Sequence, residues 1–337
     1  MSRLPVTREQ DGENTVYRNA GRRIRNAREI ARIEALAIPP AWTDVEISRS
    51  SSAKVLARGV DEAGRHQAVY SPAYVRHQEK KKYARVLQFA ERLPRLRKQL
   101  DHDLRRRRLS EDKVVACIVK LIDQEFFRVG NPEYARKYEH YGITTLRRKH
   151  TDVSSTSVTF DFIGKSGKRH VKTVRDPQLV NVIRRLNEMP GHEIFRFLDE
   201  DGTIHDIDSR RVNAYVKRHM GRDFSAKDFR TWGGTLLATS ALLAVERERG
   251  DAGEDTAVVR DVVERVADRL GNTPAVTKDS YIDPRVFAAF EDGVTIPAVH
   301  RAMSRMRPRK YLTVEEQCVL KVLCLAESFG SAGGSFW

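Results

Sequence analysis

The pattern of hydrophobic and polar residues changes character along the chain. Between residues 42 and 70, apolar residues come in short runs separated by Ser and Gly, and Asp61-Glu62-Ala63-Gly64 is a turn signal between two of them. This pattern predicts short strands and a hairpin. From Val86 onward, apolar residues recur every three or four positions, which predicts amphipathic helices. We expect Pro94 to divide the first of these helices, the charged run 76–82 to form a hinge before it, and residues 1–25 to be extended or frayed.

A second pair of strands interrupts the helical pattern. Residues 157–163 and 169–174 alternate around Gly164-Lys165-Ser166-Gly167-Lys168, which predicts a hairpin with two lysines at its tip. Helices are expected at 27–37, 114–126, 177–187, 210–220, 235–245, 256–270 and 284–290. The capping box Thr313-Val314-Glu315-Glu316 predicts a last helix that packs on the main domain. A charged linker is expected at 246–255.

These elements predict an α+β protein. We expect a small β-rich N-terminal domain at 1–80, a mainly α-helical domain with a β-hairpin at 81–300, and a C-terminal helix with a flexible tail at 301–337. A chain of 337 residues is long enough for such a division.

The charge balance indicates a polyanionic partner. The formal net charge is +15 and the pI is about 9.8, with basic residues along the whole length, so nucleic acid is the first expectation and an anionic membrane the second. The three cysteines have neither disulfide-framework nor zinc-ligand spacing. The absence of a long apolar run, of an export signal and of a phosphate-binding P-loop predicts a cytoplasmic protein without membrane span, metal or ATP use.

Candidate chemistry begins at a tyrosine. Gly271 ends a predicted helix, and we expect Pro274 to keep the helix from resuming, so that a polar turn presents Tyr281. A phenol with a pKa of about 10 is a poor nucleophile near neutrality unless cations stabilise its anion. Arg128 and Arg230 are candidate donors to a phosphate, since a guanidinium stays charged and matches phosphate geometry.

Each cation also has a purely structural interpretation. Arg128 follows a helix and is typical of a solvated cap, and Arg230 is placed to pair with Asp228. The hairpin lysines, Lys165 and Lys168, are typical of a solvent-exposed turn. Their order along the chain, with Tyr281 last, is more specific than any one of them.

Four motifs in that order resemble the type IB DNA topoisomerases, most closely the small poxvirus-like and bacterial members. The motifs are Phe127-Arg128-Val129-Gly130-Asn131, Phe162-Ile163-Gly164-Lys165, Lys227-Asp228-Phe229-Arg230-Thr231-Trp232-Gly233, and Gly271-Asn272-Thr273-Pro274 with Tyr281 nine residues after Asn272. A pattern of Asp61, Gly64, Arg65, Gln67 and Tyr70 is similar to the family's DNA-clamping β domain. The likeness covers about residues 38–290.

The resemblance implies a C-shaped clamp around duplex DNA on a fold related to the tyrosine recombinases. Tyr281 would form a 3′-phosphotyrosyl link, Arg128 and Arg230 would stabilise the transition state, and Lys165 would be the general acid. Arg65, Gln67, Tyr70, Lys168 and Lys227 are the expected DNA contacts. We expect a monomer associated with the bacterial nucleoid, whose reaction needs neither ATP nor metal, and hence no cofactor.

Two positions leave alternatives open. The best-known relatives carry histidine where this chain has Asn272, and an amide donates hydrogen bonds but does not titrate near neutrality, so we expect slower chemistry without loss of activity. Lys168 is a rival to Lys165 as the acid. A tyrosine recombinase remains an alternative, although Lys227 stands where those enzymes usually have histidine. A non-catalytic DNA-binding protein is the other alternative.

Overall fold

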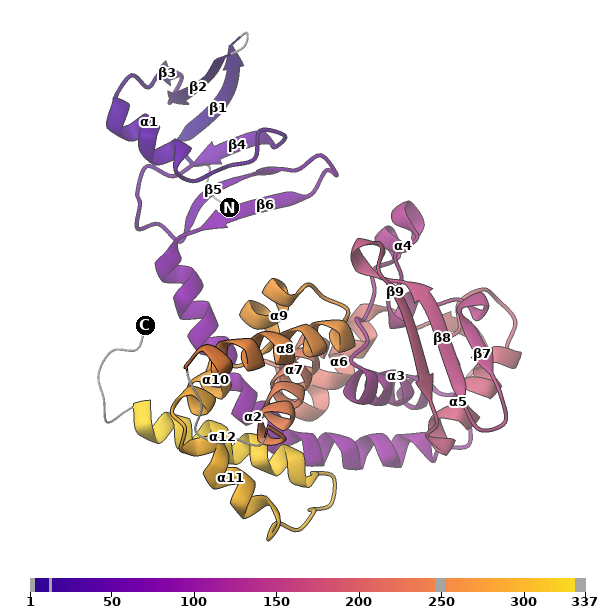
Figure 1. Cartoon of the computed structure of the whole chain (residues 1–337). Coiled ribbons are helices and arrows are strands. Elements are labelled where there is room, and N and C mark those ends of the chain that lie inside the picture. Colours follow the sequence, from indigo (N-terminus) through magenta and orange to yellow (C-terminus); the bar gives the residue numbers. More distant parts are fainter. Residues whose placement is uncertain (1–3, 12–13, 246–251, 331–337) are drawn as a thin grey trace. The chain divides into compact units, whose positions relative to one another are not determined.

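The computed structural model describes residues 4–11, 14–245 and 252–330. The chain forms two compact units, Met1–Ala84 and Arg85–Trp337, which are taken in turn below. The smaller unit is rich in strands and the larger is mainly helical, as the sequence predicts (Figure 1). Within the described residues, none of the helices combines the length and hydrophobicity needed to cross a lipid bilayer.

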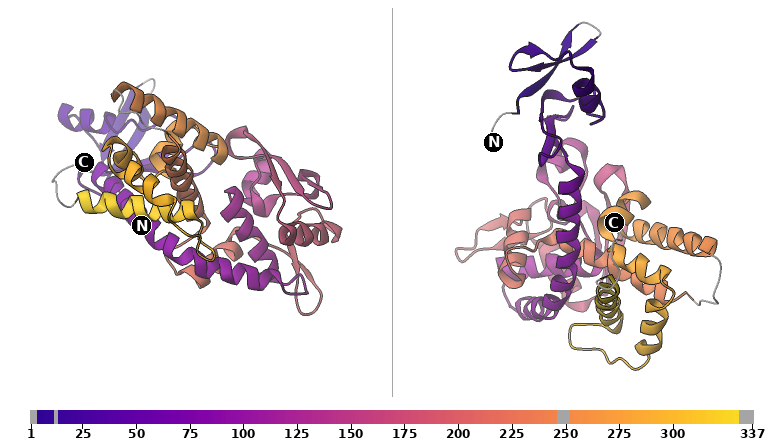
Figure 2. Two further views of the ribbon diagram at one scale, coloured as in Figure 1. Left: turned by 60° about the horizontal axis from the view of Figure 1, so that its bottom comes forward. Right: turned by 90° about the vertical axis from the view of Figure 1, so that its left-hand side faces the viewer.

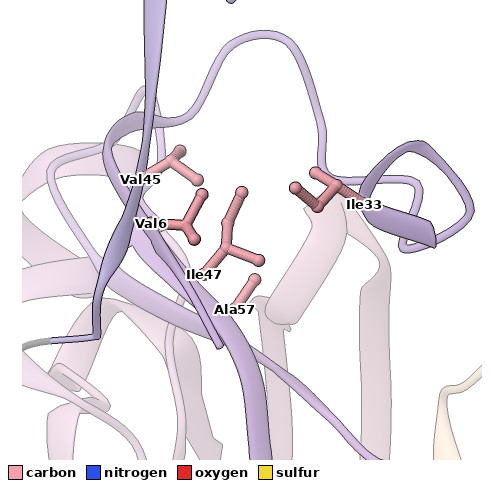
Figure 3. Close-up of a cluster of buried hydrophobic side chains, with 5 residues drawn as sticks. All are labelled: Val6, Ile33, Val45, Ile47 and Ala57. Atoms are coloured by element: carbon pink, nitrogen blue, oxygen red, sulfur yellow. The ribbon is translucent and has the colours of Figure 1, made fainter. Parts of the chain in front are cut away.

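The smaller unit is built on a six-stranded antiparallel sheet with strand order β3-β2-β1-β4-β5-β6. Its strands are β1 (Val6–Asp11), β2 (Asn14–Asn19), β3 (Arg22–Arg23), β4 (Thr43–Ile47), β5 (Val55–Val60) and β6 (His66–Tyr70). Helix α1 (Ala27–Glu34) buries Ile33 against the sheet, where it meets Val6, Val45, Ile47 and Ala57 in a small core (Figure 3). The β5–β6 hairpin around residues 61–64 confirms the prediction from the turn signal.

The described part of residues 1–25 is extended, as one half of the expectation has it, but it is not frayed, because it forms strands β1, β2 and β3 of the sheet. β1 pairs with β2 along its whole length and with β4 at Val6 and Thr7. Among the side chains of these two strands whose burial is described, Val6 and Val16 alone are buried, and the other positions are mostly polar. Pairing of β1 with the adjacent β2 and with the more distant β4 therefore stabilises a segment whose own apolar pattern is too sparse to predict it.

The larger unit begins within helix α2 (Pro72–Leu104), which runs without interruption through Pro94 and through the expected hinge at 76–82. Both predictions of a break are wrong. A proline inside a helix costs about 3 kcal/mol. Here Phe89, Leu93, Leu96 and Leu100 on the same helix are each at most 1% exposed, and burying such side chains offsets that cost.

Helices surround α3 (Glu111–Glu125), whose residues from Lys113 to Val119 are all buried. The other helices are α4 (Pro132–Tyr138), α5 (Pro177–Glu188), α6 (Ser209–Met220), α7 (Ala226–Leu243), α8 (Ala252–Leu270), α9 (Pro274–Tyr281), α10 (Pro284–Glu291), α11 (Thr295–Met303) and α12 (Val314–Gly330). Three short 3₁₀ turns, η1 (Ile143–Thr145), η2 (Arg148–His150) and η3 (Lys165–Gly167), complete the helical elements described. The helices predicted at 177–187, 210–220, 256–270 and 284–290 are confirmed within a few residues, whereas α7 begins nine residues before the predicted start at 235.

The predicted hairpin is part of a three-stranded antiparallel sheet. β8 (Val158–Ile163) pairs with β9 (Arg169–Val174) across η3, and β7 (Thr151–Val153), which the sequence did not indicate, pairs with the other edge of β8. A two-stranded pair, β10 (Arg196–Leu198) and β11 (Ile204–Asp206), stands apart. Within the larger unit the β7–β9 sheet lies at one end and helices α10–α12 at the other (Figures 1 and 2).

The capping box that opens α12 is confirmed. The Thr313 N–H donates to Glu316 at 2.9 Å, and the Glu316 N–H donates to the Thr313 hydroxyl at 3.2 Å. Glu316 also pairs with Arg97 of α2 at 2.6 Å, and α12 packs on α7, α10 and α11. The helix therefore docks on the larger unit, as expected. Most of the predicted linker 246–255 and the tail beyond residue 330 lie outside the described residues.

Candidate active site

The turn after α3 places Arg128. Phe126 ends the helix in the left-handed conformation (φ 57°), which is uncommon for a bulky side chain and costs about 1–3 kcal/mol. Gly233 on α7 makes this turn possible, because a Cβ there would stand 2.9 Å from Cζ of the Phe126 ring and closer still to other ring atoms. Phe127 is buried against Phe160 and Phe162 of the hairpin. The aromatic pair thus fixes the backbone from which Arg128 extends.

Helix α7 supplies Arg230 and the contact surface for Tyr281. Asp228 accepts hydrogen bonds from the N–H and hydroxyl of Ser225 at the start of the helix, so the anticipated Asp228–Arg230 pair is replaced by a helix cap. Arg230 is 4% exposed and points toward the Tyr281 ring, whose centroid lies 5.0 Å from its Cζ. Gly234 lets the helix approach the Tyr281 backbone, because a Cβ there would stand 3.0 Å from the Tyr281 carbonyl carbon.

Tyr281 is the last residue of helix α9, and the prediction of a continuous polar turn from 271 to 281 is wrong. Gly271 does end α8, in the left-handed conformation (φ +67°). Pro274, however, begins a new helix instead of preventing one. Its missing N–H costs nothing at the first helical position, and the Thr273 hydroxyl caps the new helix by accepting from the Val276 N–H at 3.4 Å.

Asn272 joins the two arginines. Its Oδ1 accepts from Nη2 of Arg128 and, at 3.3 Å, from Nη2 of Arg230. A guanidinium only donates, so the atom facing both arginines must be the amide oxygen and Nδ2 must face the other way. That Nδ2 is buried without a hydrogen-bond partner among the described residues. Buried donors of this kind are usually satisfied by ordered water or by a bound group.

Backbone carbonyls hold the rest of both guanidinium groups. Arg230 donates to the carbonyl of Phe126 at 2.5 Å and to that of Leu270 at 2.9 Å. Arg128 donates to the carbonyl of Gly271 through both Nη atoms, at 3.3 Å each. The turn after α3 and the end of α8 are therefore locked to each other through the two cations.

The phenol and the arginines change each other's acidity. Burial alone would raise the pKa of the Tyr281 phenol, but Arg230, Arg128 and Lys227 favour its anion, and the net pKa is lowered. Burial, followed by repulsion from Arg128, lowers the pKa of Arg230 to about 10. A phenol of lowered pKa beside two fixed cations has the electrostatics of an activated nucleophile.

A pocket of about 260 Å³ opens in front of these groups. Its lining brings together Arg128, Lys227, Arg230 and Tyr281, with Ser225 and Ala226 at the N-terminus of α7. Helix N-termini and arginines both favour anions. The pocket therefore suits a phosphate group next to the Tyr281 hydroxyl. No cluster of His, Cys, Asp and Glu side chains suited to hold a metal ion occurs in the described ranges.

The two hairpin lysines have different surroundings. Lys168 pairs with Asp268 at 3.2 Å. Lys165 lines a hollow together with Arg128 and Arg230, and its ammonium group has no hydrogen bond or ion pair to any described residue. Both lysines are exposed. Lys165 is thus the hairpin lysine that borders the arginine pair, while Lys168 is engaged elsewhere.

Comparison with known proteins identifies the fold around this site. Residues 71–305 match the family model of the eukaryotic DNA topoisomerase I catalytic core, and residues 16–61 match that of the bacterial DNA topoisomerase IB N-terminal domain. The chain belongs to the type IB DNA topoisomerases. DNA topoisomerase 1B of Acanthamoeba polyphaga mimivirus is 32% identical over 284 residues, which cover 82% of this chain and 84% of the relative. DNA topoisomerase 1B of Vaccinia virus (strain Copenhagen) is 20% identical over 265 residues, covering 77% and 81%.

The topoisomerase residues expected to contact DNA from the smaller unit gather at the β5–β6 hairpin. Asp61 accepts from Nε of Arg65 at 2.7 Å and from Nε2 of Gln67 at 2.9 Å, and these bonds, with that from Arg65 as the largest cause, lower the pKa of Asp61. Tyr70 is 45% exposed and its ring contacts Tyr74. Asp61 thus organises the two residues that the sequence selects, and their role in DNA binding stays a prediction.

Two residues of this topoisomerase site were missed by the sequence analysis. His170 and Lys172 line the hollow that also contains Arg128, Lys165 and Arg230. The sequence does contain a signal for them. Along β9, Val171 separates His170 from Lys172, and side chains of a strand alternate between its two faces, so either the valine or the two polar residues must point inward. The lysines of the hairpin turn gave no indication of which face of β9 points inward.

Proposed function

We propose that the chain relaxes supercoiled duplex DNA with Tyr281 as the nucleophile. The observation that carries the proposal is that Arg128 and Arg230 lie beside the Tyr281 phenol. Asn272 is bonded to both arginines, in a chain that belongs to the type IB topoisomerases. The Tyr281 phenol loses its proton to solvent, its oxygen attacks a backbone phosphorus, and the bond from phosphorus to the 5′ oxygen breaks. The products are a 3′-phosphotyrosyl link and a free 5′ hydroxyl, which takes its proton from Lys165.

Religation reverses these steps. After the cleaved strand has rotated about the intact one, the 5′ hydroxyl attacks the phosphotyrosine and gives its proton to Lys165. The Tyr281 oxygen leaves as the phenolate and takes a proton from solvent. The energy of the broken bond is kept in the covalent intermediate, so the cycle consumes no ATP. Arg128, Arg230 and the Nδ2 of Asn272 donate to the non-bridging oxygens, where charge accumulates in the transition state.

The DNA contacts extend this proposal. We assign backbone contacts to Lys168 and Lys227 near the scissile phosphate, and contacts to the duplex to Arg65, Gln67 and Tyr70 of the smaller unit. On this proposal a monomer encloses duplex DNA as a C-shaped clamp, and its catalytic fold is related to that of the tyrosine recombinases. Support for these finer points comes from the motif resemblance and from the formal charge of +15.

Relaxation of supercoiled plasmid, in the presence of a chelator and without ATP, tests the proposal. The wild-type protein should relax the plasmid and form a covalent protein–DNA adduct, and Tyr281→Phe should do neither while binding DNA normally. Tyr138→Phe, at an exposed tyrosine of α4, is the matched control and should retain full activity. Relaxation by Tyr281→Phe at the wild-type rate would remove the basis of the assignment.

A further inference from the structure

Strand β9 has its polar and apolar residues on the opposite faces from those expected. Val171 is 60% exposed, whereas Lys172, the next residue, is 7% exposed. His170, two positions before Lys172 and therefore on the same face, is half-buried. Turning a lysine inward and a valine outward costs stability, because the ammonium group loses its hydration and the valine side chain becomes exposed to water. Local rules are broken in this way mainly where function requires it.

Lys172 is attached to the end of helix α3. Its Nζ donates to the carbonyl of Glu125, the last residue of that helix, at 2.7 Å. The Glu125 carboxylate is paired with Arg269 at 2.8 Å, so the bond from Lys172 goes to the backbone and not to the side chain. A cation at a helix C-terminus is favoured by the helix dipole. The contact joins the hairpin to the turn that carries Arg128, three residues after Glu125.

The His170 ring fills the space between two glycines. A Cβ on Gly164 would stand 2.6 Å from Cδ2 of the ring, and a Cβ on Gly271 would stand 2.9 Å from its Nε2. The ring also stacks on Phe162, with centroids 5.2 Å apart. Gly164 immediately precedes Lys165, and Gly271 immediately precedes Asn272. The His170 ring therefore sets the distance between the turn that carries Lys165 and the segment that carries Asn272.

We propose that His170 and Lys172 are positioning residues for DNA strand cleavage and religation. Lys172 places Arg128 through the carbonyl end of α3, and His170 places the Lys165 turn against the Asn272 segment. The inference rests on the proposed function of Tyr281. The competing explanation is that an inward charge on an edge strand serves only to prevent pairing with other chains, which predicts no effect on the chemistry.

Single-turnover cleavage of a duplex with sulfur in place of the scissile 5′ oxygen separates the two roles. A thiol has a pKa of about 8.5 and leaves without a proton donor, so sulfur restores cleavage to a variant that lacks only the proton from Lys165. The substrate is built at a cleavage site mapped with the wild-type protein. Lys165→Ala provides the reference for full rescue, and Val171→Ala, on the outer face of β9, is the matched control.

His170→Ala should lower cleavage of the ordinary duplex on the order of 10- to 100-fold, as expected for a misplaced catalytic group, and sulfur should restore most of the loss. Lys172→Met should lower cleavage of both substrates alike, because Arg128 acts on the phosphate and not on the leaving group. His170→Phe, which keeps a ring, and Lys172→Arg, which keeps the charge and the donor, should recover most of the rate. All variants should bind DNA as the wild type does.

The dependence on pH adds a readout that a purely structural role would leave unchanged. Burial, followed by repulsion from Arg269, Arg230 and Arg128 against attraction to Glu125, lowers the pKa of Lys172 to about 8. The other titratable group facing it is His170, and burial lowers the pKa of that ring to about 4, so it stays neutral. Cleavage by the wild type should therefore decline above about pH 8 in a step that Lys172→Arg lacks.

Three results would overturn the inference. They are cleavage by His170→Ala and Lys172→Met within twofold of Val171→Ala, an absence of sulfur rescue for His170→Ala, or the same alkaline decline in Lys172→Arg as in the wild type. Failure of the proposed function itself looks different. In that case Tyr281→Phe relaxes plasmid, or sulfur fails to rescue even Lys165→Ala.

Discussion

Gly234→Ala tests how closely the position of Tyr281 depends on helix α7. The new Cβ would stand 3.0 Å from the Tyr281 carbonyl carbon, 3.2 Å from its Cβ and closer still to its carbonyl oxygen, whereas ordinary contacts begin at 3.4 Å. Because the contact is with backbone, relief requires the end of α9 to move away from the arginines. A displacement of about 1 Å from productive geometry costs on the order of 100-fold in rate.

The stability change should be much smaller than the rate change. Alanine is favoured over glycine in a helix by about 1 kcal/mol, and overpacking costs about 1–3 kcal/mol, so the two partly cancel. Thr235, the next residue, accepts the Asp283 N–H at 3.1 Å, so the strain reaches both Tyr281 and the segment that follows it. We therefore expect a rate loss of about 100-fold with a fall in unfolding free energy of at most about 2 kcal/mol.

The assay is single-turnover formation of the covalent adduct, with urea unfolding measured in parallel. Gly202→Ala is the matched control, because its φ of +82° strains an alanine while no atom lies within 4 Å of the new Cβ. It should lose about 1 kcal/mol of stability and no activity. If Gly234→Ala forms adduct within threefold of the wild-type rate, then the contact does not position the phenol, and the argument from α7 is refuted.

Three other predictions follow from single contacts. Asn272→Ala and Asn272→Asp both remove the Nδ2 donor and should lower the cleavage rate about 10²- to 10³-fold, while Asn272→His should raise the rate above that of the wild type. Cleavage by Asn272→Asp at the wild-type rate would contradict this. Lys165→Ala should lose about 10²- to 10⁴-fold in cleavage and Lys168→Ala little, since Lys168 is paired with Asp268; equal defects would reverse the choice of acid. Burial would raise the pKa of Asp103, but hydrogen bonds from Gln99, Tyr215 and other donors lower it. The stability that Asp103 contributes is therefore present above its unfolded pKa of about 3.9 and is lost as the pH falls through its folded pKa. In urea unfolding at about pH 2–5, Asp103→Asn should flatten this loss of stability.

The sequence identifies the residues of the site better than it identifies how they are held. Arg128, Arg230, Asn272 and Tyr281 stand in recognisable motifs, and the structure brings all four together. The end of helix α3 was predictable, but the left-handed conformation at Phe126 was not, because a bulky side chain rarely adopts it. Its stability comes from Gly233, more than a hundred residues later, which leaves room for the ring. Contacts of this kind join residues that are far apart in the sequence, so a sequence motif does not show them.

The errors in secondary structure have the same origin. Proline was interpreted as a helix breaker at residues 94 and 274, but its effect depends on position: at 94 the packing of neighbouring leucines offsets its cost, and at 274 it occupies the one helical position where it is favourable. The first strands were missed because they carry few apolar residues, although β1 and β2 form a local hairpin. Local rules predicted elements well where the element buried a regular apolar stripe of its own.

The chemistry of the site follows from what holds its arginines. Their hydrogen bonds go to the carbonyls of Phe126, Leu270 and Gly271 and to the amide oxygen of Asn272, all of which are neutral. A carboxylate partner would neutralise each guanidinium and would have to be displaced before a phosphate gained the full attraction. With neutral acceptors the positive charge stays available, as the lowered pKa of the Tyr281 phenol indicates. Burial, the largest cause, lowers the pKa values of Arg128 and Arg230 themselves. This arrangement destabilises the free protein, because two cations are poorly compensated. The negative charge that accumulates on the phosphate in the transition state compensates them, so the stabilisation is gained at the step that it accelerates.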